Sequence, residues 1–92
     1  MYRITLKRQF KKDFDLMKRQ GRPLGELRRV IDVLATGAKL EAKYKDHPLR
    51  GEYVNCRECH VEPDWLLIYK INGNVLELIL VRTGSHSELF GR

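Results

Sequence analysis

Three histidines and their acidic neighbours are the side chains of this sequence best suited to proton transfer. His47, His60 and His86 lie in the polar, turn-like segments DHP, ECHVEPD and GSHSELF. Histidine has an ordinary pKa near neutrality, and a nearby carboxylate can orient the ring and tune its proton affinity. A His–carboxylate group beside a second His would suit a reaction that takes up one proton and delivers another.

Glu58 and His60 stand two residues apart in a strand-like segment, so both side chains are expected on one face of the strand. Asp64 follows just past this strand, at a turn from which it could return beside His60. The three residues could form a catalytic acid–base group. The alternative is a surface hydrogen bond between Glu58 and His60, with Asp64 capping the turn.

Cys56 and Cys59 form a C-x-x-C pair that His60 follows, a pattern that invites a zinc or haem interpretation. Zinc would need two more ligands, and no second C-x-x-C pair is present. Residues three apart in a strand also face opposite sides. We therefore interpret both cysteines as small strand residues and expect no metal site.

A phosphate and a base could be recognised near the end of the chain. Arg82 ends the last apolar run, and His86 and Phe90 follow a turn. Arginine pairs with phosphate through its planar fork, and an aromatic ring can stack on an unpaired base. The alternative is that the tail packs onto the sheet. Trp65 could be a stacking surface, but its place at the head of WLLIY favours the core.

The spacing of apolar residues predicts the elements that position these groups. Residues 2–6 predict a strand, and residues 7–20 and 24–36 predict two helices, which Gly21 and Pro23 join tightly. Residues 38–50 predict a loop. Three strand-like segments follow, EYVNCRECHV, WLLIYKI and VLELILVR, the last two joined by a tight turn at 72–74. The order β-α-α-β-β-β predicts an α+β fold in which a helical hairpin packs on an antiparallel sheet.

Length and composition set the class of protein. The chain has 92 residues, of which 42% are hydrophobic and 33% charged, so we expect residues 1–92 to form a single globular domain. No apolar run reaches the roughly 20 residues that a membrane-spanning helix needs. Two cysteines do not make a disulfide scaffold, and the expected compartment is a reducing cytoplasm.

The net charge of +6 is concentrated in the first third of the chain. Residues 1–30 contain ten Lys and Arg but three Asp and Glu. In the first predicted helix a basic arc flanks the apolar arc of Phe10, Phe14 and Met17. The basic arc indicates a polyanion or an acidic protein partner, and the alternative is a solvated helix face. Its candidate RNA-binding residues are Lys7, Lys11, Lys12 and Lys18.

Two stretches resemble the YafQ-type branch of the RelE/ParE superfamily, which are toxins of bacterial type II toxin–antitoxin modules. They are RECHVEPDWLLIY at 57–69 and LVRTGSHSELF at 80–90. The segment DHPLRG at 46–51 and the basic first helix resemble the same branch. The match covers the whole chain in order and length.

This resemblance implies a microbial-ribonuclease-like fold that cleaves mRNA without a cofactor, in YafQ at the ribosomal A site. It also implies a cognate antitoxin, with mRNA and the ribosome (rRNA) as further partners. Glu58 matches a position that is acidic in relatives, and Arg82 matches the phosphate contact. The related gyrase-poisoning branch lacks such a set of histidines. The family's catalytic positions fall on His47, His60, Asp64, His86 and Phe90.

The resulting hypothesis is metal-independent transesterification, in which the substrate 2′-OH attacks the adjacent phosphorus. His86 is assigned as the general acid, and the base remains open among Asp64, His60 and His47. Arg82 would hold the phosphate and Phe90 would position a base. The competing hypothesis is a non-catalytic basic module that binds RNA or an acidic protein.

Overall fold

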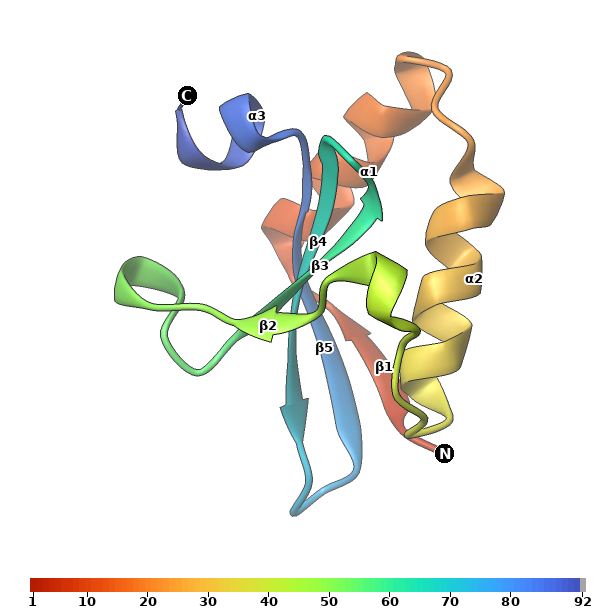
Figure 1. Ribbon diagram of the computed structural model, residues 1–92, viewed down its shortest axis with the longest axis vertical. Helices are drawn as coiled ribbons and strands as arrows, with labels where there is room; N and C mark the ends of the chain where they lie inside the picture. Colours follow the sequence, from red (N-terminus) through yellow and green to blue (C-terminus); the bar gives the residue numbers. More distant parts are fainter. Residues whose placement is uncertain (92) are drawn as a thin grey trace.

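The computed structural model describes residues 1–91, which form one mixed sheet with helices on either side (Figure 1). The predicted α+β class is confirmed. No helix in this part of the chain is long and apolar enough to cross a membrane. The elements, in chain order, are β1 (Arg3–Leu6), α1 (Arg8–Arg19), α2 (Leu24–Ala35), the 3-10 turn η1 (Ala42–Tyr44), β2 (His47–Pro48), the 3-10 turn η2 (Gly51–Tyr53), β3 (Arg57–Glu62), β4 (Trp65–Asn72), β5 (Glu77–Gly84) and α3 (His86–Phe90).

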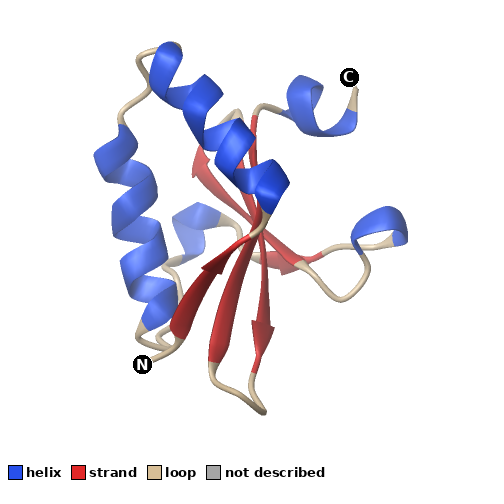
Figure 2. Cartoon of the chain, turned by 180° about the vertical axis from the view of Figure 1, so that it is seen from behind, coloured by secondary structure: helices blue, strands red, loops and turns tan. Residues whose placement is uncertain are grey.

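Helices α1 and α2 form the predicted hairpin and cover one face of the sheet (Figure 2). The apolar arc of α1 is the buried one, with Phe10 3% and Met17 0% exposed. Gly21 follows α1 with φ +71°, a left-handed conformation that glycine adopts without a steric penalty. The main core lies between this hairpin and the helix-side residues of β3, β4 and β5, including Cys59, Leu67 and Leu80.

The sheet has the strand order β1-β5-β4-β3-β2. Strands β2 to β5 pair antiparallel as predicted, but β1 runs parallel to β5, so the sheet is mixed. A parallel pair needs a long crossover connection, and pairing with the last strand was not evident from the order of elements alone. Strand β1 ends beside Leu80, and α1 therefore begins next to the second half of β5.

Three short elements differ from the sequence-based prediction. The predicted loop contains β2, whose His47 pairs with Glu58. The start of the predicted strand EYVNCRECHV is instead the turn η2. The tail forms the one-turn helix α3, whose N-cap Ser85 and Glu88 make a capping box. Elements of two to five residues are too short to show a period, which is why apolar spacing did not predict them.

A β-bulge in β5 places Arg82 on the face of the sheet that is turned away from the hairpin. Leu80 pairs with Tyr69 and Arg82 pairs with Ile68, so Val81 is one extra residue opposite this step. Without the bulge, strict alternation would put Arg82 on the face of Leu80, in the main core. With it, Arg82 shares the face of Ile68 and of Glu58, which pairs with Ile68 in β3.

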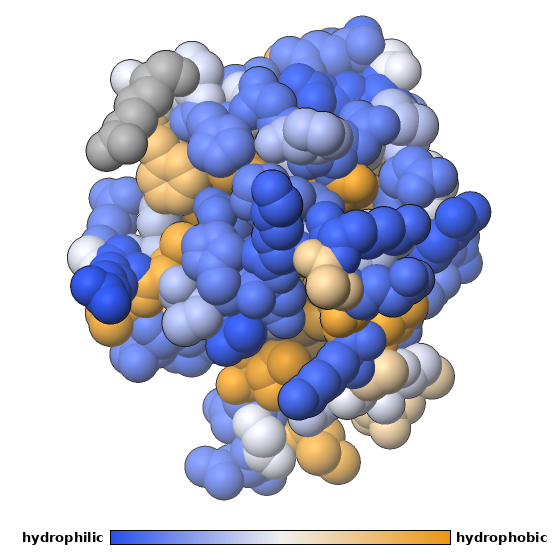
Figure 3. Space-filling model, viewed as in Figure 1, coloured by the Kyte–Doolittle hydropathy of each residue, from blue (hydrophilic) through white to orange (hydrophobic). Residues whose placement is uncertain are grey.

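The face opposite the hairpin therefore collects the predicted site residues. It holds a small second core of Leu66, Ile68 and Leu89, the last contributed by α3. Seen in the same view as Figure 1, this side of the molecule is largely hydrophilic with separate hydrophobic patches (Figure 3). It is around this second core that the chemistry-bearing side chains gather.

Candidate active site

His86 and Asp64 form a close pair at one end of the sheet. His86 is the first residue of α3, and Asp64 lies in the turn between β3 and β4. The Asp64 Oδ1 atom lies 2.7 Å from His86 Nδ1 and accepts the His86 backbone N–H at 3.0 Å. With Nδ1 turned to the carboxylate, Nε2 is the ring nitrogen left for a substrate.

The pKa of Asp64 is lowered from its ordinary value. The largest cause is the backbone N–H of His86, and the hydrogen bond from the His86 side chain adds to it. Asp64 thus stays ionised to lower pH than a free carboxyl, and its hydrogen bonds with His86 orient the imidazole ring. Sequence spacing indicated that Asp64 could return beside His60; in the structure Asp64 pairs with His86, whose ring neighbours that of His60.

The second group is centred on Glu58, whose side chain is buried between two histidines. Its Oε2 atom lies 2.9 Å from His47 Nε2 and 3.9 Å from His60 Nε2. Glu58 and His60 share a face as strand alternation predicted, and His47 joins them through the β2–β3 register. The Glu58 Oε1 atom is buried and has no hydrogen-bond partner among the described residues.

The two groups lie next to each other. The ring centroids of His60 and His86 are 5.7 Å apart, and those of His47 and His60 are 6.4 Å apart. A cavity of about 270 Å³ is lined by Leu49, Glu58, His86 and Phe90. One residue of each group, Glu58 and His86, therefore borders the same space. A larger apolar cavity, of about 790 Å³, lies between the hairpin and β1 and contains no histidine.

Arg82 and Phe90 complete the predicted set and are connected through Tyr53. The Tyr53 hydroxyl accepts a hydrogen bond from Arg82 Nη1 at 3.3 Å. The Tyr53 ring meets the Phe90 ring edge-on, with centroids 6.0 Å apart. Arg82 also donates to Asp13 of α1, which is the largest cause of its raised pKa.

Sequence reasoning missed Asp13 and Tyr53. Asp13 was detectable, because it lies three residues after Phe10 and four before Met17, on the apolar arc of α1. A carboxylate at such a position is buried and needs a partner. Nothing in the local sequence distinguished Tyr53, which lies in η2.

Other predicted residues lie apart from this cluster. Trp65 was kept as a candidate stacking surface, but its side chain is 0% exposed and its indole N–H donates to Thr83 Oγ1. Trp65 is therefore a core residue, and its assignment to RNA binding is corrected. The basic candidates all lie exposed on α1 or at its N-cap: Lys7, Lys11, Lys12 and Lys18.

One group within residues 1–91 has the geometry to hold a metal ion, and it does not include the cysteines. His47, Glu58 and His60 each offer a ligand atom, and these atoms lie within 4.8 Å of one another. Two imidazoles and a carboxylate suit zinc or another borderline transition metal. Cys59 is fully buried, and burial raises its pKa to about 12, so it remains a thiol.

A five-stranded sheet with a helical hairpin on one face and a His–carboxylate cluster on the other defines a small RelE-type ribonuclease domain. A family model described as the bacterial toxin of type II toxin–antitoxin system, YafQ, matches residues 2–91. The chain belongs to this YafQ family. The predicted family and its toxin class are thereby confirmed, and the relatives named mRNA interferase toxin YafQ confirm its class as an endoribonuclease.

Individual relatives agree over nearly their whole length. The mRNA interferase toxin YafQ of Escherichia coli K12 is 40% identical over 84 residues, 90% of this chain and 89% of the relative. The crystal structure of the E. coli DinJ–YafQ complex matches with a TM-score of 0.90 and 38% identity, covering 99% of this chain and 100% of that one. A metal-bound toxin from Helicobacter pylori matches with a TM-score of 0.91 and 47% identity, covering 98% and 100%.

The Asp64–His86 pair makes a prediction about titration. The Asp64 carboxyl should titrate below its ordinary pKa of 3.8, as followed by carbon NMR of the side-chain carboxyl against pH. In His86→Ala its pKa should rise part of the way back, because the side-chain hydrogen bond is lost while the backbone N–H remains. In His47→Ala it should not move. An unchanged Asp64 titration in His86→Ala would contradict the pairing.

Proposed function

We propose that this type II toxin of the YafQ family cleaves mRNA bound to the ribosome, which stops translation. The name of the E. coli relative, mRNA interferase toxin, supports the substrate. The observation that carries the proposal is that two His–carboxylate groups, Asp64–His86 and Glu58 with His47 and His60, lie side by side, and that Glu58 and His86 line one cavity. They supply two separate proton-transfer sites about 6 Å apart, a spacing that fits the two oxygens of a reacting phosphodiester.

The reaction is transesterification within the RNA strand. The substrate 2′-OH attacks the adjacent phosphorus while a base removes the hydroxyl proton. An acid protonates the departing 5′-oxygen, which gives a 2′,3′-cyclic phosphate and a 5′-OH. Arg82 would stabilise the charge that develops on the phosphorane oxygens.

His86 is the general acid in this proposal. As an imidazolium it would donate its Nδ1–H to Asp64 and present its Nε2–H to the leaving oxygen. Asp64 is thereby occupied in orienting His86 and is not free to act as the base. The two carboxylates of the site thus have different tasks, since Glu58 stands with the other two histidines.

His60 is the base that the geometry supports best. Both ring nitrogens of His47 have close partners, Pro48 carbonyl oxygen at 3.1 Å and Glu58 Oε2 at 2.9 Å. His60 has a longer separation from Glu58, 3.9 Å, and its ring lies against that of His86. Glu58 would stabilise the imidazolium that forms when His60 takes up the proton.

The unpaired Glu58 Oε1 atom supports a substrate site at the cavity. A buried acceptor without a donor costs about 1–3 kcal/mol. A bound substrate can remove this cost by offering a hydroxyl or amino group from the cavity side. Phe90, which lines the same cavity, would stack on an unpaired base.

An antitoxin partner is also proposed. The E. coli relative was crystallised with DinJ, and the dense positive charge of α1 is complementary to an acidic chain. The same charge would attract rRNA, and phosphate contacts of this kind weaken as salt rises. The two partners would then compete for exposed lysines of α1, including Lys11, Lys12 and Lys18.

His86→Ala tests the acid. Removing a general acid typically lowers the rate by about 10²–10⁴-fold, so cleavage of mRNA on translating ribosomes should fall by that order. The thermal transition should be nearly unchanged, because the ring is exposed. Ser87→Ala, the next residue of α3, is the matched control and should keep full activity. Full activity in His86→Ala would refute the assignment.

Paired variants test the base. His60→Gln should lower single-turnover cleavage by about 10²–10⁴-fold, whereas His47→Gln should cost less, because His47 acts on the site through Glu58. The measurement is the cleavage rate of each variant at one pH with saturating toxin. Equal losses in the two variants, or a larger loss in His47→Gln, would contradict the assignment of His60.

The chemistry itself is tested with two substrates and a chelator. Cleavage should survive EDTA and leave a 2′,3′-cyclic phosphate, detected by resistance of the 3′ end to ligation. A message with a single 2′-deoxy nucleotide at the cleavage position should not be cut there. Cutting at the deoxy position would exclude attack by the 2′-OH, and binding without any cleavage would favour the non-catalytic module.

A further inference from the structure

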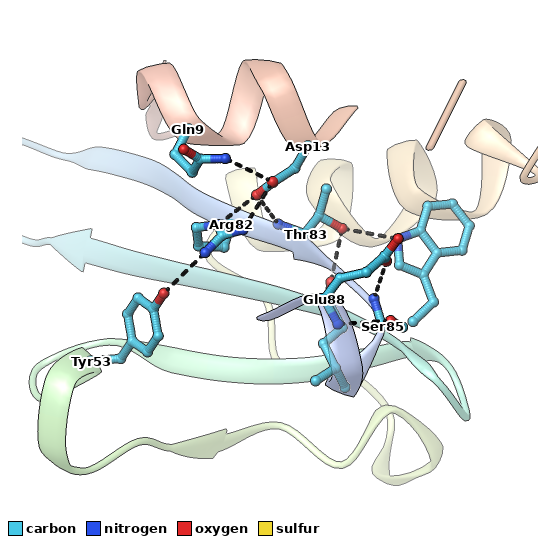
Figure 4. Close-up of polar contacts among 9 residues, drawn as sticks. Gln9, Asp13, Tyr53, Arg82, Thr83, Ser85 and Glu88 are labelled. Atoms are coloured by element: carbon cyan, nitrogen blue, oxygen red, sulfur yellow. Dashed lines mark hydrogen bonds and ion pairs between the residues drawn. The ribbon is translucent and has the colours of Figure 1, made fainter. Parts of the chain in front are cut away.

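We propose that Asp13 and Tyr53 are positioning residues of the active site, which hold the Arg82 guanidinium from two sides in one fixed orientation toward the scissile phosphate. This inference rests on the proposed function and concerns two residues that the catalytic scheme above does not use. Figure 4 shows the arrangement, with Asp13 reaching down from α1 and Tyr53 approaching from the opposite side.

Asp13 binds the edge of the guanidinium formed by Nε and Nη2. Arg82 Nε donates to Asp13 Oδ2 at 2.7 Å, and Nη2 donates to Oδ1 at 3.1 Å. This is the two-bond, coplanar arrangement that gives arginine–carboxylate pairs their directional specificity. Both side chains are largely buried, with 9% of Asp13 and 20% of Arg82 exposed, so solvent screens the pair little.

The Asp13 carboxylate is itself fixed. Its Oδ1 accepts a hydrogen bond from Gln9 Nε2 at 3.1 Å, one turn earlier in α1. Its Oδ2 accepts the backbone N–H of Thr83 at 3.2 Å, at the edge of β5 beyond the end of β1. A carboxylate tied to both a helix and a strand cannot turn without breaking these bonds, and it transmits that rigidity to Arg82.

Tyr53 contacts the guanidinium of Arg82 on the side away from Asp13 and also packs against Phe90, the proposed base-stacking residue. Its hydroxyl accepts from Arg82 Nη1 at 3.3 Å, and its ring packs edge-on against Phe90. The guanidinium has five N–H groups, and these contacts occupy three of them. The two N–H groups that remain are one on Nη1 and one on Nη2. A phosphate could accept one hydrogen bond from each of them.

The register of the sheet turns this fixed guanidinium toward the catalytic face. Arg82, Ile68 and Glu58 pair across β5, β4 and β3, so Arg82 stands two strands from Glu58, or about 10 Å. Without its two partners, Arg82 would sample several rotamers at the sheet edge. The contribution of the pair to stability is expected to be small, because desolvation of both charges offsets their attraction. Its effect is on geometry.

The experiment compares variants that remove one partner with variants that also remove Arg82. The single variants are Asp13→Asn, Tyr53→Phe and Arg82→Ala. The double variants combine Arg82→Ala with Asp13→Asn or with Tyr53→Phe. Asp15→Asn removes a carboxylate from an exposed position of the same helix, and Tyr2→Phe removes a hydroxyl beside β1. Both are matched controls. For each chain, kcat and KM are measured with mRNA on ribosomes, together with the thermal transition.

Positioning predicts a loss in kcat at nearly constant KM, because Arg82 stabilises the transition state more than the bound substrate. Asp13→Asn should lower kcat about 10- to 100-fold and Tyr53→Phe about 2- to 10-fold. Neither substitution should lower the rate further in the Arg82→Ala background. The controls should match the wild-type chain.

Two outcomes would overturn the inference: unchanged kcat in Tyr53→Phe, or losses that multiply with that of Arg82→Ala, which would show a general structural effect. If Asp13→Asn does not fold, the inference is tested by Tyr53→Phe alone and in combination with Arg82→Ala, since Tyr53→Phe removes one oxygen atom only. A wild-type chain that binds ribosomes without cutting would instead refute the proposed function.

Discussion

The step in register at Val81 is the constraint on which the active site depends. Side chains on a strand alternate strictly, so one extra residue moves everything that follows to the other face. Before the bulge, Leu78 and Leu80 are buried beneath the hairpin; after it, Arg82 lies on the same face of the sheet as Glu58, and Thr83 takes the inner position. At this inner position the Thr83 hydroxyl accepts a hydrogen bond from the Trp65 indole N–H. The bulge therefore also satisfies a buried polar group of the main core.

The two faces of the sheet have different roles, one in stability and the other in the proposed active site. The hairpin side carries the main core, which fixes the strands, and the other side carries a much smaller core and the polar cluster. Each carboxylate of the site stands against a basic group: Asp64 with His86, Glu58 with His47, and Asp13 with Arg82. For the buried Glu58 and Asp13, such pairing limits the cost of burying charge in a domain this small. It also fixes the direction in which each ring or guanidinium points.

Part of this arrangement was predictable from the sequence because it depends on short periods. Strand alternation placed Glu58 and His60 on one face, and helical spacing placed Phe10 and Met17 in the core. The pairing of Asp64 with His86 was not predictable, since it joins a turn to a helix of five residues that has no measurable period. Resemblance to a family identified the histidines, but only the structure showed which carboxylate serves which ring.

Long-range attraction and chemistry are carried by different parts of the molecule. The proposed catalytic groups largely neutralise one another, so they contribute little to the field that an approaching polyanion would meet. The exposed lysines of α1 supply that field, which extends about 10 Å at moderate salt. Helix α1 also reaches the proposed site through Asp13, which lies on the buried side of the helix, whereas those lysines are exposed. In the proposed mechanism, one helix thus carries both the docking charge and the carboxylate that orients Arg82. Since the Asp13 carboxylate already accepts four hydrogen bonds, a substrate phosphate attracted by the lysines would meet the open side of Arg82 rather than a free negative charge.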